Sequence, residues 1–98
     1  MEPSPEVAAR FAKNLRRCRE RAGLSQEELG YRAQLHRTQV GSLERGVRTP
    51  RIDTVLRLAG SLSTPVSDLL AGLEWTPGYV EVVGGGFEIA ERPELQAA

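Results

Sequence analysis

Apolar residues recur at helical spacing in separate blocks along the first 70 positions. In the first block the intervals are four, four, three and four residues, at Val7, Phe11, Leu15, Cys18 and Ala22. This spacing forms one face of a helix. Ser4 and Pro5 are favourable residues for its start, and Gly23 for its end.

Two short helices are expected next. Ser25 and Glu28 have the spacing of a capping box, which marks the start of the second helix. Residues 34–36 break the pattern, and a third helix is predicted over residues 37–45. The positions expected to face inward are Leu29, Ala33, Val40 and Leu43.

The pattern predicts two further helices. The fourth has an apolar face expected to consist of Ile52, Val55, Leu56, Ala59 and Leu62. Thr64 as cap and Pro65 as first helical residue predict a short fifth helix, which places Leu69 and Leu70 against the core. The expected fold class is therefore all-α, a compact five-helix bundle with a short C-terminal tail.

The tail has a different pattern. Residues 79–83 and 87–90 are expected to be short strands around a glycine turn at 84–86. The tail could be a dimerisation hairpin whose aromatic residues cover the fourth and fifth helices, a strand that binds a partner protein, or disordered. These aromatic residues are Trp75, Tyr79 and Phe87. We expect two units: residues 1–72 as a helical domain and residues 73–98 as an acidic appendage.

Composition excludes several functional classes. The 98 residues include one cysteine and one histidine, so no disulfide framework and no clustered metal site are expected. No apolar run approaches the length of a membrane span, and no secretory signal is visible, which makes a cytoplasmic location the expectation. Cys18 is expected to pack in the core rather than sense redox state, and His36 to be polar rather than a metal ligand. No catalytic set or cofactor motif is present, so an enzyme is not expected.

Net charge is zero, from 13 basic and 13 acidic residues, which by itself argues against a nucleic-acid partner. The charges are unevenly placed, however. Residues 10–57 have a net charge of +7, whereas residues 58–98 have −5. A basic unit joined to an acidic end explains the neutral average. If the basic unit binds DNA, its affinity is expected to fall steeply with salt.

Three short runs match a known family: Leu24-Ser25-Gln26-Glu27-Glu28-Leu29, Leu43-Glu44-Arg45-Gly46 and Thr49-Pro50. Together they resemble the helix-turn-helix proteins of the Cro and phage-repressor type, the XRE family, over about residues 8–72. The resemblance implies the lambda-repressor-like fold and binding to double-stranded DNA. Four positions depart from it. His36 replaces the usual serine or threonine cap of the third helix, and Arg51 the usual small polar cap of the fourth. Gly30 stands where alanine is usual, and either is expected to fit. Gln34 stands where a turn glycine is frequent, although glutamine tolerates positive φ less well.

The resemblance also implies roles for individual residues. Base contacts from the third helix map onto Arg37, Thr38 and Ser42, and Gln39 is a further candidate. Gln26 matches a phosphate-contacting glutamine, while three basic residues are expected on phosphates or serve only solubility: Arg45, Arg48 and Arg51. Arg19 and Glu44 are expected to form a buried structural ion pair.

The leading functional hypothesis is a transcriptional repressor that binds a near-palindromic operator as a homodimer. The alternative is an antitoxin-like interaction protein whose tail, residues 73–98, binds a partner protein.

Overall fold

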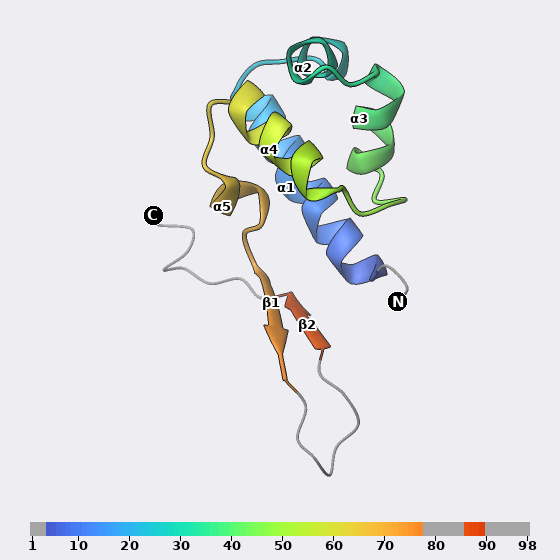
Figure 1. Cartoon of the computed structure of the whole chain (residues 1–98), viewed down its shortest axis with the longest axis vertical. Helices are drawn as coiled ribbons and strands as arrows, with labels where there is room; N and C mark the ends of the chain where they lie inside the picture. The colour runs from blue at the N-terminus through green and yellow to red at the C-terminus, as the bar shows by residue number, and fades with distance from the viewer. Residues whose placement is uncertain (1–3, 78–85, 90–98) are drawn as a thin grey trace.

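The computed structural model describes residues 4–77 and 86–89. Within these residues the five predicted helices are confirmed: α1 (Pro5–Arg21), α2 (Gln26–Ala33), α3 (Arg37–Glu44), α4 (Ile52–Ser61) and α5 (Val66–Leu69). Two strands follow, β1 (Leu73–Thr76) and β2 (Gly86–Ile89). Figure 1 shows α2 and α3 side by side and the two strands projecting from the helical body; α4 packs against α2 and α5.

The core lies where α1, α2, α4 and α5 meet. Each of these helices contributes a side chain that is at most 1% exposed: Phe11, Leu15, Leu29, Leu58 and Leu69. Full burial of one such side chain stabilises the fold by about 1.5–3 kcal/mol. The four residues predicted to face inward from α2 and α3 are all buried. Cys18 is also in the core, where burial raises the pKa of its thiol and keeps it neutral.

The predicted inner face of α4 was partly wrong. Ile52 is 81% exposed and Leu56 is 58% exposed, whereas Leu58, which the spacing argument omitted, is fully buried. The buried stripe is Val55, Leu58, Ala59 and Leu62. It has helical spacing too, so two overlapping apolar stripes fit the same sequence. The positions of α2 and α5, the helices that α4 contacts, decide which stripe is buried.

The start of α5 also differs from the prediction by one residue. Pro65 is the N-cap, with an extended ψ of 145°, and the helix begins at Val66. Thr64 does not cap α5, because its backbone N–H donates to the carbonyl of Ala59 and closes the preceding helix. Ser63, at φ 50°, makes the turn between the two helices.

A buried asparagine links α1 to the end of α5. Asn14 is fully buried, and its Nδ2 donates to the carbonyls of Leu69 and Ala71, both at 2.9 Å. Arg10 Nε donates to the Ala71 carbonyl at 3.1 Å. These bonds satisfy backbone acceptors that the short α5 leaves free. They hold the point from which β1 departs.

The tail contains a hairpin, but not the predicted one. β1 pairs with β2 in antiparallel register, with Leu73 opposite Ile89 and Trp75 opposite Phe87. The predicted strand at 79–83, with Tyr79, lies outside the described residues. Gly86, expected in the turn, belongs to β2. The rings of Trp75 and Phe87 meet edge to face at 5.2 Å and remain about half exposed, while β2 contacts α1.

Candidate nucleic-acid interface

The turn between α2 and α3 depends on two unusual positions. Gln34 adopts the left-handed conformation, at φ 58° and ψ 43°, and its backbone N–H closes α2. A Cβ on Gly30 would lie 2.6 Å from the carbonyl oxygen of Leu35. The expectation that alanine fits equally well at position 30 was therefore wrong, because the chain of the turn passes too close to α2.

His36 provides the cap of α3 in place of the usual serine or threonine. Its Nδ1 accepts from the backbone N–H of Thr38 at 3.1 Å, and the Gln39 Oε1 accepts from the His36 N–H at 2.9 Å. These reciprocal bonds form a capping box. They fix the first turn of α3, the turn from which base contacts are expected.

The predicted base-contacting residues line the outer face of α3. Arg37, Thr38 and Gln39 are exposed, and Ser42 is half-buried. All four have partners within the protein: Glu27 for Arg37, the His36 ring for Thr38, the His36 backbone for Gln39 and Arg45 for Ser42. Each partner holds its side chain in place. Amide and guanidinium groups have further donors that these bonds do not use.

The predicted ion pair lies behind this face. Arg19 Nε donates to Glu44 Oε2 at 2.6 Å and Arg19 Nη2 to Glu44 Oε1 at 2.9 Å, with side chains 12% and 2% exposed. The hydrogen bond to Glu44 raises the pKa of Arg19 above its ordinary value. Gln26 Nε2 also donates to Glu44 Oε1, at 3.2 Å. One carboxylate thus connects α1, the start of α2 and the end of α3.

The other predicted phosphate contacts lie between α3 and α4. Arg45, Arg48 and Arg51 are exposed. Arg48 and Arg51 line a hollow of about 150 Å³ together with Gln39, so the structure brings one base candidate next to two phosphate candidates. Arg51 also pairs with Asp53 at 3.4 Å across an exposed surface.

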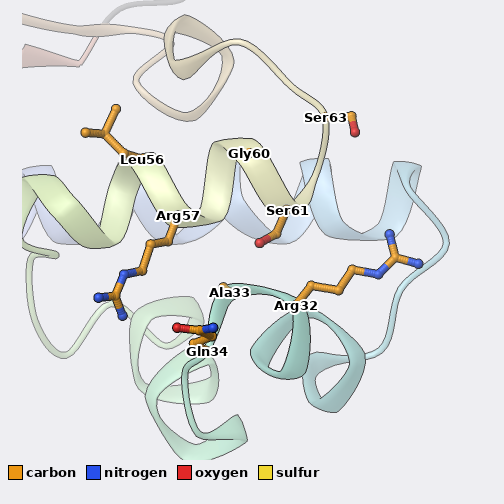
Figure 2. A pocket seen from close by; sticks show the side chains of 8 residues that line it. All are labelled: Arg32, Ala33, Gln34, Leu56, Arg57, Gly60, Ser61 and Ser63. Carbon is orange, nitrogen blue, oxygen red and sulfur yellow. The ribbon is translucent and has the colours of Figure 1, made fainter.

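A larger hollow, of about 510 Å³, lies between the end of α2 and α4 (Figure 2). Arg32 and Arg57 line it, and none of the predicted DNA-contacting residues does. Figure 2 shows Leu56 and Arg57 on opposite sides of α4. Leu56, which is 58% exposed, is also among the residues that line this hollow.

Two features of the interface were not indicated by the sequence pattern. Glu27 Oε2 lies 3.1 Å from Arg37 Nη1, and the Gln26–Glu44 bond orients a predicted phosphate contact. Both join residues at least ten positions apart. Only the angle between α2 and α3 brings them together.

The described part of the chain indicates no metal or membrane site. In residues 4–77 and 86–89, no three His, Cys, Asp or Glu side chains are placed to hold a metal ion. None of the helices described there is long and apolar enough to span a bilayer.

Comparisons with known proteins agree with this geometry. Control protein C.SmaI of Serratia marcescens is 44% identical over 60 residues, covering 61% of this chain and 71% of its own. The crystal structure of the restriction-modification controller protein C.AhdI from Aeromonas hydrophila superposes with a TM-score of 0.61 and 37% identity, over 63% of this chain and 94% of that one. The hypothetical transcription factor NHTF from Neisseria gives a TM-score of 0.63 and 31% identity, over 71% and 82% of the two chains.

The family model that describes a helix-turn-helix domain matches residues 3–71, most of the chain. This match confirms the resemblance noted from the short sequence runs and the lambda-repressor-like fold it implied. The relatives are regulators and not enzymes. The chain belongs to the helix-turn-helix domain family and is a DNA-binding regulator.

Proposed function

We propose that the protein represses transcription by binding a near-palindromic operator as a homodimer. In this proposal residues 1–72 are the DNA-binding unit. Its base contacts come from Arg37, Thr38, Gln39 and Ser42, and its phosphate contacts from Gln26, Arg45, Arg48 and Arg51. The observation that supports it best is the position of Arg37. It lies exposed at the first position of α3, in a turn fixed by the His36 cap.

The names of the relatives support a proposal for which genes the protein regulates. C.SmaI is named a control protein and C.AhdI a restriction-modification controller protein. We place this chain in the same role, as a controller of genes for a restriction enzyme and its methyltransferase. In this role, one operator would lie in the promoter of the chain's own gene.

The exposed apolar side of α4 supports the homodimer. Ile52 and Leu56 are one helical turn apart, and both are largely exposed. Two copies related by a two-fold axis could bury this patch against itself. The two α3 helices would then meet half-sites about one helical turn of DNA apart.

Leu56→Asp is expected to give a monomer in sedimentation and to weaken operator binding, whereas Tyr31→Asp, which also places an acid at an exposed apolar residue, should leave the dimer intact.

A selection from a randomised duplex library tests DNA recognition. The wild-type protein should enrich one near-palindromic sequence. Arg37→Ala should bind it more weakly by about 1–3 kcal/mol and lose base preference at one position in each half-site. Arg32→Ala, in the hollow away from the predicted contacts, is the matched control for loss of one arginine. Unchanged affinity and preference in Arg37→Ala would refute the assignment of α3.

The hairpin favours a second candidate function, an antitoxin-like protein that binds a partner through residues 73–98. Its supporting observation is the half-exposed pair of Trp75 and Phe87. Co-expression with the product of the neighbouring reading frame tests it. A stable complex that Trp75→Ser disrupts would favour this function. No complex, together with intact operator binding, would exclude it.

A further inference from the structure

Glu27 and Arg37 form an ion pair on the face of the motif that is proposed to meet DNA. Glu27 is the second residue of α2 and Arg37 the first of α3. Their side chains are 73% and 65% exposed, and Oε2 lies 3.1 Å from Nη1. Ion pairs this exposed add little to folding stability. A role in DNA recognition is therefore a better explanation of the pair than a role in the fold.

We propose that Glu27 is a specificity-determining residue that positions Arg37 for a guanine and discourages binding elsewhere. This inference rests on the proposed function, in which Arg37 contacts a base edge.

The first part of the argument is geometric. A guanidinium has five N–H donors in one plane, and a guanine edge needs two of them, at O6 and N7. The bond from Nη1 to Glu27 leaves donors on the other nitrogens. It also restricts a side chain with several rotatable bonds before DNA arrives. Restricting a group in its bound orientation reduces the entropy lost on binding.

The second part is electrostatic. Glu27 adjoins Gln26, a predicted phosphate contact, so its carboxylate would lie near the negatively charged DNA backbone. Where a guanine is present, Arg37 can contact both the base and Glu27, and the carboxylate remains neutralised. Where the guanine is absent, the Arg37 side chain would bind a phosphate instead. The Glu27 carboxylate would then lie beside the DNA without its ion-pair partner. Like charges juxtaposed in this way disfavour the wrong complex.

The surroundings leave the pair accessible. Glu27 and Arg37 line an open hollow of about 350 Å³ together with Tyr31, Leu35 and His36. Tyr31 is 87% exposed, so it does not cover the two charged groups. A base edge can approach the guanidinium without displacing the carboxylate.

The test compares wild type with five full-length variants, on the duplex that wild type enriches and on the same duplex with its Arg37-dependent guanine replaced. Glu27→Ala should reduce discrimination between the two roughly three- to tenfold and bind random duplex more tightly than wild type. Glu27→Gln keeps an acceptor oxygen without the charge, so it should retain more discrimination than Glu27→Ala while still binding random duplex more tightly. In Arg37→Ala, the further change Glu27→Ala should leave discrimination unaltered.

Glu20→Gln is the matched control, because Glu20 pairs with Arg16 at 3.5 Å on an exposed surface of α1. It removes the same charge from α1 instead of α2, and Arg16 keeps a second acidic neighbour, Glu44, at 3.9 Å. If Glu27→Ala and Glu27→Gln change affinity for all duplexes by one common factor, as Glu20→Gln does, the positioning role is overturned. If wild type enriches no sequence at all, the proposed function fails and this inference with it.

Discussion

Arg19 on α1 and Glu44 at the end of α3 form a two-pronged ion pair, with N–O distances of 2.6 and 2.9 Å. The Glu44 side chain is only 2% exposed. Because the same carboxylate accepts from Gln26, it links the orientation of α3 to that of the first residue of α2. The pair thus fixes the end of α3 against α1, on the side opposite the predicted base-contacting residues.

Removal of one residue of the Arg19–Glu44 pair should lower the stability of the fold. Glu44→Ala leaves the Arg19 guanidinium buried without its counter-ion, and we expect a loss of about 3–5 kcal/mol in the free energy of unfolding. Chemical denaturation followed by circular dichroism measures it. Glu20→Ala, at an exposed pair, should cost no more than about 1 kcal/mol. A Glu44→Ala protein with an unchanged melting temperature would contradict the structural role.

Two glycines in helices should respond in opposite directions to alanine. Both substitutions gain about 0.5–1 kcal/mol of helix propensity. At Gly60, where nothing lies within 4 Å of the place a methyl group would take, that gain should appear as added stability. At Gly30 the methyl would meet the Leu35 carbonyl, so a net loss of about 1–3 kcal/mol is expected. Urea denaturation of the two variants compares them directly, and a stabilised Gly30→Ala would disprove the close approach.

Gln34 stores backbone strain in the turn. A left-handed conformation costs a non-glycine residue about 1–2 kcal/mol. We expect Gln34→Gly to stabilise the fold by about 0.5–1 kcal/mol, since glycine relieves the strain but has more freedom in the unfolded chain. Gln34→Ala is the control, because it shortens the side chain without relieving the strain. Equal stability of the glycine and alanine variants would argue that the turn is unstrained.

The capping box of α2 should make stability depend on pH. Hydrogen bonding from the backbone N–H of Ser25 lowers the pKa of Glu28 below its ordinary value. A carboxyl whose pKa falls on folding contributes stability above its unfolded pKa, and this contribution is lost as pH falls through the folded value. Glu28→Gln keeps the capping acceptor but does not titrate.

Wild type should therefore exceed Glu28→Gln in stability by a constant margin near neutral pH, and the margin should shrink below about pH 4.5. Unfolding curves in urea between about pH 2.5 and pH 7 measure this difference. Parallel profiles of the two proteins over the whole range would show that Glu28 makes no such contribution.

Local signals in the sequence were sufficient to predict the five helices. The capping box at Ser25 and the spacing of Leu29, Ala33, Val40 and Leu43 depend on neighbours within one or two turns. Such short-range preferences act before any tertiary contact forms. Arg37 was singled out by the family resemblance, which maps base contacts onto the start of this helix.

Other features depended on packing between elements. Periodicity alone could not choose between the stripe with Leu56 and the stripe with Leu58, because both have helical spacing and only the second is buried where α4 packs on α2 and α5. The pairing of β2 with residues 73–76 likewise needs contacts between distant parts of the tail. Which strand β2 pairs with is set by its contacts with the rest of the tail, and the residues of β2 alone do not determine it.

The sequence by itself therefore determined the helix-turn-helix class, the uneven charge and the residues available to contact DNA. The tertiary structure decided which charged groups meet. Glu27 and Arg37 are ten positions apart, and nothing in the sequence paired them; Arg19 and Glu44, twenty-five apart, were expected only from the family resemblance. Such pairs form only when the crossing angles of α1, α2 and α3 bring their side chains within hydrogen-bonding distance. Because helix propensity and periodicity contain no information on these angles, the proposed positioning of Arg37 by Glu27 became visible only in the folded molecule.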